Sequence, residues 1–339
     1  MVTRFTRKDV AELAGVSTAT VSYVFNKKRY VSQELTNKVL FAAKRLNYYP
    51  DMIASSLTTK KTHNIGVLVN DLSNPLQNAV ISGIQRAAIK KGYFVNICAG
   101  ESNFDVYIDN FISRHLDGVY IAVQATEIQR EDILKLLDYN IKLVLNKTMN
   151  INDPRVNQIH LDLTAGMMMI IEYLAKQGHK DIAYLSCYDE SVLSDERLPA
   201  FKAAMRKYLG CNDPVIVYGK VPYESTIESG KILVEQLLDT GKTCSALVCS
   251  NDLMAFGAMK VLHDSGYRIP EDISVVGIDN IELCKSSIPS LTTLDQKSEE
   301  LGMAIFDLLY NDIVNGEIAQ KCIWPQLVIR DSTAPYGKG

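Results

Sequence analysis

The sequence predicts a two-part protein: a small all-α helix-turn-helix head at the N-terminus, and a larger α/β body of two lobes built on parallel, doubly wound sheets. Three observations lead to this fold class. The 339 residues exceed what one ordinary hydrophobic core holds. Apolar residues recur at helical spacing through residues 1–46, interrupted by a glycine. From residue 65 onward, short apolar runs alternate with longer amphipathic stretches, as in sheets covered by helices.

The two parts differ in charge. Residues 1–62 hold 11 Lys and Arg against 4 Asp and Glu, whereas the remaining residues hold 25 against 35. A basic head on an acidic body suits a module that approaches phosphate groups while the rest of the molecule is repelled from them. A basic tail that only aids solubility would show the same asymmetry, so charge alone does not choose between these two interpretations.

The composition is that of a globular protein, with 47% hydrophobic and 22% charged residues. No apolar run approaches the length that crosses a bilayer, and the first thirty residues carry charge throughout in place of an apolar signal segment. We therefore expect a cytoplasmic protein. The cysteines are odd in number and form no CxxC pair, so we expect reduced packing residues. They are Cys98, Cys187, Cys211, Cys244, Cys249, Cys284 and Cys322.

The head is expected to hold three short helices, each beginning at a capping side chain. Thr6 with Asp9 forms a capping box, Ser17 caps the second helix and Ser32 caps the third. Gly15 supplies the tight turn between the first two helices. The apolar positions expected to face inward are Val10, Leu13, Ala14, Val16, Val21, Val24, Leu35, Val39, Ala42 and Leu46.

The outward face of the second helix suits the major groove of DNA. Its side chains are small or able to hydrogen-bond, and none is acidic: Thr18, Ala19, Ser22, Tyr23 and Asn26. Thr18 and Ala19 lie near the helix N-terminus, where base edges are read, and Tyr23 lies one turn further on. Thr6, Ser17 and Ser32 are better placed for phosphates. Capping alone would also explain the two serines, and we expect both roles.

The run from Thr6 to Asn26 resembles the head of the LacI/GalR family of bacterial repressors. The family pattern D-V-A-x-x-A-G-V-S-x-x-T-V-S-x-V-x-N is met at every fixed position. The resemblance implies a lambda-repressor-like head that contacts DNA through Thr6, Ser17, Thr18, Ala19, Thr20, Ser22, Tyr23, Asn26 and Ser32. Tyr23 fills a variable position that is often Arg in the family, so the operator preference is expected to differ from that of relatives.

Residues 47–62 are expected to link head and body. By the same resemblance this linker is a hinge helix that becomes ordered on DNA, with Ala54 and Leu57 at the positions that enter the minor groove. Two residues depart from the family, since Asp51 stands where Asn is usual and Ser55 where Arg is usual. Packing of Leu57 on the body is the alternative interpretation.

The body is expected to contain seven strands and six helices. The strands are 65–69, 94–97, 118–121, 143–145, 182–185, 246–248 and 274–278, and the helices are about 75–91, 164–177, 195–208, 224–240, 252–264 and 295–312. The body resembles the type I periplasmic-binding-protein fold that the same family carries, through motifs such as Asp71–Pro75 and Val276–Asn280. The resemblance implies one lobe of residues 63–162 and 293–323, and another of residues 163–292 and 324–334.

The resemblance also implies a small-molecule effector site between the lobes. Arg197, Asn251, Asp279 and Gln296 match effector-contacting positions, and Asn74 and Asn146 match them more weakly. Arg and Asp in a closed cleft suit a polyhydroxylated ligand, because both form charge-assisted hydrogen bonds with hydroxyl groups. The alternative is that Arg197 and Asp279 only pair with each other.

The class of effector is less defined than its site. Leu76 and Gln77 follow Asn74-Pro75 where many relatives carry aromatic residues that stack on a sugar ring. A sugar is the default expectation, while a nucleoside, another small metabolite and a protein co-regulator stay open. The expected assembly is a homodimer on a near-palindromic double-stranded operator, away from the membrane.

The sequence lacks the signatures of two other classes of protein, a doubly wound enzyme and a secreted transport protein. An enzyme of doubly wound type would need a phosphate loop, but no GxGxxG occurs, and Gln236 stands where a P-loop before Lys242 needs glycine. The five histidines form no HExxH spacing, so we expect no catalysis, no cofactor and no bound metal. A secreted transport protein could share the body, but the basic head and the lack of a signal segment argue against it.

Overall fold

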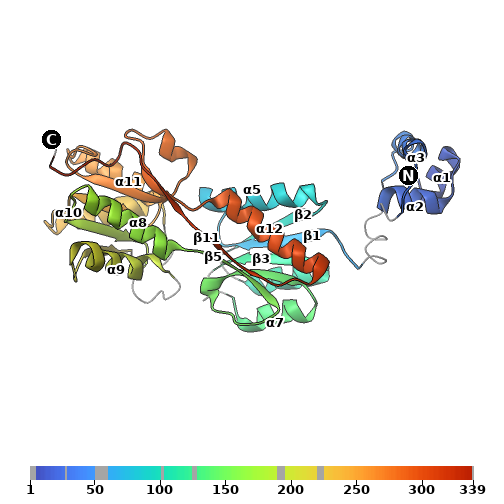
Figure 1. Cartoon of the computed structure of the whole chain (residues 1–339), viewed down its shortest axis with the longest axis horizontal. Helices are drawn as coiled ribbons and strands as arrows, with labels where there is room; N and C mark the ends of the chain where they lie inside the picture. The colour runs from blue at the N-terminus through green and yellow to red at the C-terminus, as the bar shows by residue number, and fades with distance from the viewer. Residues whose placement is uncertain are drawn as a thin grey trace. The chain divides into compact units, whose positions relative to one another are not determined.

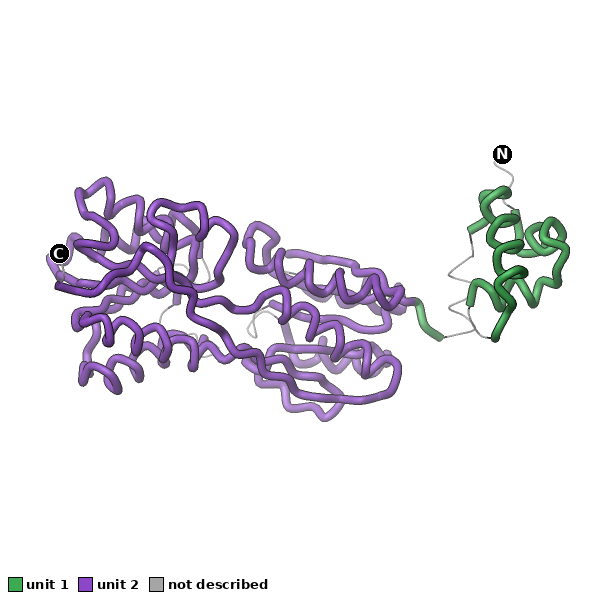
Figure 2. The backbone as a smooth tube through the Cα atoms, turned by 45° about the horizontal axis from the view of Figure 1, so that its top comes forward, with its two compact units in different colours: residues 1–62 green, residues 63–339 purple. Residues whose placement is uncertain are grey.

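The computed structural model describes residues 5–26, 29–49, 60–100, 103–123, 128–188, 195–219 and 225–337. The chain divides into two compact units, residues 1–62 and residues 63–339 (Figure 2). The positions expected to wedge into the minor groove, Ala54 and Leu57, lie outside the described residues. Within the described ranges, no helix is both long and apolar enough to cross a membrane.

The head contains the three expected helices: α1 (Arg7–Ala14), α2 (Thr18–Asn26) and α3 (Gln33–Arg45). Gly15 ends α1 in the left-handed conformation (φ 66°), which glycine adopts without the steric cost of a Cβ. The turn between α1 and α2 is therefore the one that the sequence predicts.

The head core differs from the expected set at two leucines. It is built from Val10, Ala11, Val21, Val39, Ala42 and Ala43. Leu13 is 46% exposed and Leu35 is 36% exposed, so their predicted burial is wrong. The sector of a short helix that faces the core is narrow, and on α1 and α3 the small alanines at 11 and 43 fill it.

The body consists of two lobes, each built on a six-stranded sheet (Figure 1). The first sheet has the order β11-β5-β4-β3-β1-β2 and its strands are all parallel. Its strands are β1 (Asn64–Val69), β2 (Phe94–Ala99), β3 (Gly118–Ala122), β4 (Lys142–Asn146), β5 (Val156–Leu161) and β11 (Gln320–Ile323). Its helices are α5 (Pro75–Lys90), α6 (Phe104–Ser113), α7 (Arg130–Asp138) and α12 (Ser298–Asn315).

The second sheet has the order β12-β10-β9-β8-β6-β7, and only β12 runs antiparallel to its neighbour. Its strands are β6 (Ile182–Ser186), β7 (Val215–Tyr218), β8 (Ala246–Cys249), β9 (Ser274–Asp279), β10 (Thr292–Asp295) and β12 (Gln326–Val328). The helices that cover it are α8 (Leu163–Lys176), α9 (Arg197–Leu209), α10 (Ile227–Asp239) and α11 (Asp252–Asp264), and short 3₁₀ turns occupy Lys147–Met149 and Glu282–Lys285. The predicted fold class is confirmed.

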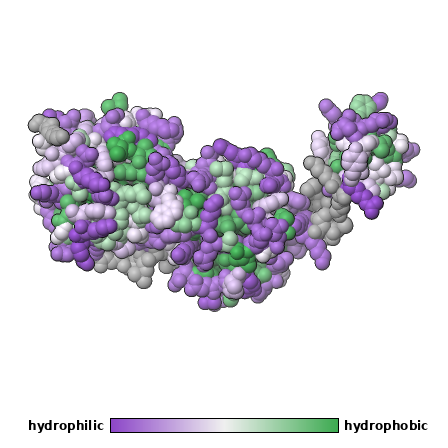
Figure 3. Space-filling view, in the orientation of Figure 1, coloured by the Kyte–Doolittle hydropathy of each residue, from purple (hydrophilic) through white to green (hydrophobic). Residues whose placement is uncertain are grey.

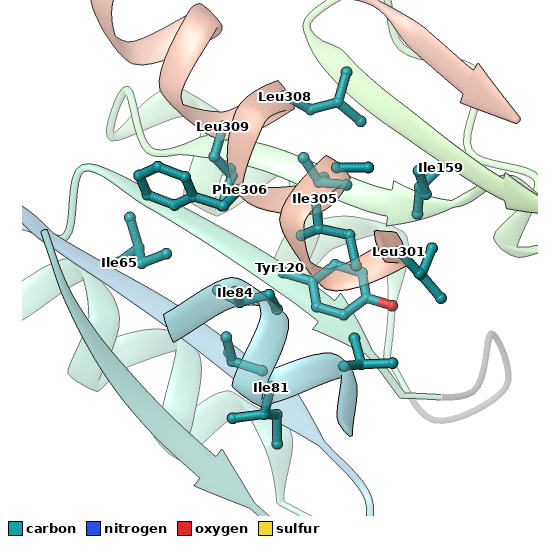
Figure 4. Close-up of a cluster of buried hydrophobic side chains, with 14 of the residues drawn as sticks. Ile65, Ile81, Ile84, Tyr120, Ile159, Leu301, Ile305, Phe306, Leu308 and Leu309 are labelled. Atoms are coloured by element: carbon teal, nitrogen blue, oxygen red, sulfur yellow. The ribbon is translucent and has the colours of Figure 1, made fainter. Parts of the chain in front are cut away.

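Helices α5 and α12 pack on one face of the first sheet with their backbones in contact. Their apolar side chains, including Ile84 and Phe306, meet over Ile65 and Tyr120 of the sheet (Figure 4). A Cβ added at Gly302 would lie 2.1 Å from the carbonyl oxygen of Val80. The contact therefore requires glycine at that position.

Some strands and helices of the body were not expected from the sequence. The missed strands are β5, β7, β10, β11 and β12, and the missed helices are α6 and α7. In β5 the buried Asn157 interrupts the apolar pattern, and it is satisfied by donating to Oδ2 of Asp312 at 2.9 Å. Helix α12 begins at Ser298 and not near 295, because β10 extends to Asp295 and Lys297 is left-handed (φ 54°).

The chain crosses between the two sheets three times, at residues 162, 296–297 and 324–325. The lobe boundaries expected after residues 162 and 323 fall at such crossings. The boundary expected after residue 292 falls inside β10, all of which belongs to the second sheet. The face of the body that is turned to the viewer in Figure 3 mixes hydrophilic side chains with apolar patches.

Candidate DNA-binding surface and effector site

The N-terminus of α2 presents small exposed side chains. Ser17, Thr18 and Ala19 are exposed. The hydroxyl of Ser17 accepts a hydrogen bond from the backbone N–H of Thr20 at 3.1 Å and also lies 2.9 Å from the Thr20 hydroxyl. Ser17 thus caps α2 as expected, and Thr20 is engaged in the same cap. The side chains of Thr18 and Ala19, in contrast, make no hydrogen bond among the described residues.

The remaining outward positions of α2 are partly covered. The amide of Asn26 donates to the hydroxyl of Ser22 at 3.1 Å, and Tyr23 is half-buried. The guanidinium of Arg29 lies over the ring of Tyr23, 5.5 Å from its centroid. Such a cation–π contact holds a positive charge beside the helix. Sequence reasoning did not include Arg29, because it follows the helix and belongs to no periodic pattern.

Thr6 and Ser32 stabilise the starts of α1 and α3. The backbone N–H and the hydroxyl of Thr6 donate to Oδ2 of Asp9 at 2.6 and 2.7 Å. The N–H of Thr6 is the main reason that the pKa of Asp9 lies below its usual range. Ser32 accepts from the N–H of Leu35 at 3.4 Å. The capping half of the prediction is observed, whereas contact with phosphates stays a prediction.

A cavity of about 290 Å³ lies between the two lobes. The first lobe lines it with polar side chains that include Asn70, Gln77 and Asn146. The second lobe adds Tyr188 and the run of residues 195–197, which holds two acids and an arginine. Small-molecule sites commonly combine such convergent polar groups with an apolar wall.

The apolar wall belongs to the core of the first lobe. Tyr120, Ile159 and Leu301 pack in that core and also line the cavity (Figure 4). Tyr120 is only 6% exposed, and burial raises the pKa of its hydroxyl, which is therefore neutral and able to donate. The cavity wall is rigid on this side because its residues are shared with the packing of α5 against α12.

Three of the six predicted effector residues line this cavity: Asn146, Arg197 and Gln296. A fourth, Asp279, lines a neighbouring cavity of about 490 Å³. A hydrogen bond joins one residue of each cavity: Nε2 of Gln296 donates to Oδ1 of Asp279 at 2.6 Å.

The other two predicted residues serve as helix caps. Oδ1 of Asn74 accepts from the N–H of Leu76 at 2.9 Å, and Oδ1 of Asn251 accepts from the N–H of Met254 at 2.9 Å. The amide of Asn251 also donates to the carbonyl of Ser225 at 2.8 Å. Neither asparagine lines the cavity of about 290 Å³. Both asparagines follow strands, as the sequence indicates, but their side chains cap the N-termini of α5 and α11.

Arg197 is held in place by Asp195 and not by Asp279. Its Nε and Nη2 donate to the two carboxylate oxygens of Asp195 at 2.9 and 3.2 Å, and its Nη1 donates to the carbonyl of Ser250 at 2.6 Å. The guanidinium also lies 5.3 Å from the ring centroid of Tyr188. The alternative pairing of Arg197 with Asp279 is therefore not what the structure shows. A planar guanidinium fixed on one edge can present its remaining N–H to a ligand.

Asp279 lies in a strained and buried environment. It is 4% exposed and has a φ of 129°, and Asn280 follows with a φ of 58°. Burial raises the pKa of Asp279 well above its usual range, the nearby Asp252 adds to the effect, and Arg197 opposes it. Asp252 steadies this loop by accepting hydrogen bonds from the Thr293 hydroxyl at 2.5 Å and the Ile281 N–H at 2.9 Å. Strained backbone of this kind persists only where the surroundings hold it, and often at functional sites.

A helix-turn-helix head joined to a two-lobed body with a polar interlobe cavity defines a class of protein: DNA-binding regulators that respond to a small molecule. Comparison with known proteins agrees with this class. Residues 6–51 match the model described as bacterial regulatory proteins, lacI family, and residues 171–333 match a periplasmic binding protein-like domain. The chain belongs to the lacI family of bacterial regulatory proteins, which are transcription regulators and not enzymes.

Relatives and solved structures match along most of the chain. The HTH-type transcriptional repressor PurR of Vibrio parahaemolyticus is 32% identical over 96% of this chain and 98% of its own length. A lac repressor dimer bound to operator and the anti-inducer ONPF has a TM-score of 0.80 and 28% identity, covering 98% of this chain and 99% of that one. A LacI family regulator from Enterococcus faecium with bound ribose has a TM-score of 0.72 and 26% identity, covering 80% and 99%.

The chain is therefore a DNA-binding transcriptional repressor with an effector-binding body. Its head is the part matched to the family's DNA-binding model, and its cavity lies in the part that resembles ligand-bound relatives. Operator DNA and a small-molecule effector are its partners.

Proposed function

We propose that the chain represses transcription by binding a near-palindromic operator as a homodimer, and that a small polyhydroxylated effector such as a sugar controls this binding from the interlobe cavity. It acts in the cytoplasm, where its DNA target lies. The observation that carries the proposal is the position of Arg197. Its guanidinium reaches the cavity, where Asn146 and Gln296 also offer hydrogen-bonding groups.

The size and lining of the cavity favour one sugar ring. A volume of about 290 Å³ is at the lower end of the range for small-molecule sites. The carboxylate of Asp195 lines the wall, and its Oδ2, which accepts one hydrogen bond from Arg197, can accept a second from a ligand hydroxyl group. Two solved relatives support a sugar, since one carries ribose and another is described as a CelR–cellobiose complex.

A nucleoside or nucleobase is the second candidate effector. The rings of Tyr120 and Tyr188 both line the cavity, and aromatic rings stack on flat heterocycles. A base would use this surface more fully than a sugar, whereas a sugar would use more of the carboxylate and amide groups.

Apolar side chains on the edge of the first lobe suit the proposed dimer. Ile89 is 71% exposed, Phe94 is 65% exposed and Val106 is 62% exposed. They belong to α5, the edge strand β2 and α6, which are consecutive elements. Exposed apolar residues on neighbouring elements are typical of an interface. We expect a second copy of the chain to cover these apolar side chains. A helix-turn-helix head reads one half of an operator, so a repressor of this kind needs two copies.

An effector controls DNA binding only if it distinguishes two arrangements of the lobes. Residues from both lobes line the cavity, so a bound molecule favours the arrangement in which all of them reach it. The fold-change in operator affinity is at most the ratio of the effector affinities for the two arrangements of the lobes. The effector weakens or strengthens operator binding, depending on which arrangement of the lobes it favours.

Isothermal titration of the purified full chain with a panel of sugars and a panel of nucleosides and nucleobases tests the effector class. We expect one ligand per chain from the sugar panel, with weaker binding in Asn146→Ala and Gln296→Ala. Gln129→Ala, at the N-cap of α7 and at a position that does not line the cavity, is the control. Binding from the base panel alone would replace the first candidate by the second, and binding unaffected by both cavity variants would contradict the site.

A further inference from the structure

Three side chains of different chemistry meet where the first sheet ends and the chain crosses to the second lobe. Ligand atoms of His160, Asp162 and Cys322 all lie within 4.8 Å of one another. The strand register explains this. His160 on β5 is paired with Cys322 on the parallel strand β11, and Asp162 follows His160 by two residues. Asp162 lies one residue past the end of β5, where its backbone N–H still donates to the carbonyl of Ile323 on β11, so the alternation of the strand continues and the three side chains project together.

A fourth side chain, on the second lobe, lies next to His160. Oε1 of Glu196, at the start of α9, lies 3.8 Å from Nε2 of His160. Among the described residues, Nδ1 of His160 and Oε2 of Glu196 are buried and make no hydrogen bond. Oδ1 of Asp162 accepts from the N–H of Ala165 at 2.7 Å, which leaves its second oxygen available to the cluster. Buried polar atoms without a partner are rare in proteins, and coordination of a cation would use them.

The charges around the cluster also favour a dication. Asp162, Glu196 and a Cys322 thiolate would carry three negative charges, and the nearby Lys147 carries one positive charge. An ion of charge +2 balances the net charge of the ionised groups. Asp195, the other acid nearby, is already paired with Arg197.

We propose that His160, Asp162 and Cys322, with Glu196 as the fourth ligand, bind one Zn²⁺ per chain at the junction of the lobes. A set of imidazole, thiolate and carboxylate ligands in a group of four suits zinc, whereas Mg²⁺ and Ca²⁺ prefer oxygen ligands alone. The ligands come from β5, β11 and the start of α9, so the ion ties together both lobes beside the effector cavity. No sequence pattern indicates this cluster, because Glu196 and Cys322 are far from His160 and Asp162 along the chain.

Cobalt substitution tests the site directly. The purified full chain, freed of metal and kept reduced, is titrated with Co²⁺ and followed by absorption. We expect saturation at one equivalent, with a thiolate-to-cobalt charge-transfer band and visible bands of tetrahedral cobalt, all removed by Zn²⁺. Cys322→Ser should lose the charge-transfer band. Cys98→Ser should keep it, because Cys98 lies on β2 at the opposite edge of the same sheet.

The affinity for Zn²⁺, measured by competition with a chelator, should fall at least about tenfold in His160→Gln and in Glu196→Gln. Zinc should also slow alkylation of Cys322 by iodoacetamide at least about tenfold in the wild-type chain, a measurement that needs no variant and so does not depend on the folding of Cys322→Ser. The absence of a thiolate band, a band that survives in Cys322→Ser, or an alkylation rate indifferent to zinc would each overturn the proposal.

Discussion

Arg197 depends on Asp195 for its position in the effector cavity. Two parallel hydrogen bonds to one carboxylate fix the plane of the guanidinium, and the carbonyl of Ser250 fixes its other end. Lysine carries the same charge but has no fork of donors, so it cannot reproduce this arrangement.

Arg197→Lys should therefore weaken effector binding by about 1–3 kcal/mol, which is the usual value of a charge-assisted hydrogen bond, while leaving the protein folded. Isothermal titration with the identified effector measures the change. Arg268→Lys is the matched control, because Arg268 forms a similar pair with Asp272 on the surface, away from the cavity. Equal effector affinities in the two variants would remove Arg197 from the site.

Asp279 should make stability depend on pH. Its folded-state pKa is raised by burial, so its contribution to stability is present below the pKa of the unfolded chain and is lost as the pH rises toward the folded value. Asn keeps an oxygen that accepts from Gln296 and tolerates a positive φ. We expect Asp279→Asn to raise the melting temperature at pH 8 and to flatten its fall between pH 5 and 8. A variant with a steeper fall than the wild-type chain would contradict this origin.

The positions of the cavity residues could be predicted from the sequence, but the hydrogen-bond partners of their side chains could not. The family motifs selected Asn146, Arg197 and Gln296, and all three line one cavity, whereas their contact with an effector stays a prediction. The carboxylate that holds Arg197 was not predicted, because two acids precede it and only the folded loop decides which of them pairs. The caps made by Asn74 and Asn251 were also not anticipated, since an asparagine at a strand end can serve either a ligand or the next helix.

Among the secondary-structure elements, the pair α5 and α12 carries the tightest constraint. A Cβ on Gly302 would lie 2.1 Å from the carbonyl oxygen of Val80 and 2.9 Å from the N of Ile84, both of which are backbone atoms that cannot move aside alone. The two helices would have to separate to admit a methyl group.

Gly302→Ala should destabilise the body by about 1–3 kcal/mol or more, the usual cost of overpacking, although alanine is the better helix former. Urea unfolding measures the change in the free energy of unfolding. Asn311→Ala, at an exposed position of the same helix, should leave this free energy within about 0.5 kcal/mol of the wild-type value. A stabilised Gly302→Ala would show that the helices are not in backbone contact.

Helix α2 should depend on Arg29 for part of its affinity for DNA. The Tyr23 ring holds this guanidinium beside the helix, 5.5 Å from the ring centroid. If Arg29 contacts a phosphate, Arg29→Ala should weaken binding to all sequences alike and lower the slope of log affinity against log salt by about one. Fluorescence anisotropy with labelled DNA at several salt concentrations measures both. Lys90→Ala, in the body, is the control, and an unchanged slope would exclude the contact.

Three of the missed strands, β5, β11 and β12, lack a clear apolar pattern for physical reasons. Strands β11 and β12 are short, and β11 is largely exposed, so they lack the apolar runs by which buried strands are recognised. Strand β5 contains a buried asparagine whose partner, Asp312, lies far along the chain. Long apolar strands such as β1 and β9 were predicted within one residue, because their burial on both faces leaves no other pattern possible.

At the scale of the whole molecule, the division of charge and the division of structure coincide. The unit of residues 1–62 carries the excess of Lys and Arg, and the unit that follows carries the excess of acids. A head attracted to phosphates on a body repelled by them confines DNA contact to the head. Composition and one long motif were enough to predict this organisation, whereas the sites between lobes required the fold.

Control of operator binding by a molecule in the interlobe cavity is the central claim. The measurement that tests it most directly is the operator affinity of the full chain with and without saturating effector, on DNA selected from a random-sequence pool. We expect the dissociation constant of the wild-type chain for the operator to change by at least about fivefold, as allosteric couplings of about 1–3 kcal/mol give. Arg197→Lys should need a higher effector concentration to reach half of this change. An operator affinity that stays constant while titration shows the effector bound would contradict the claim.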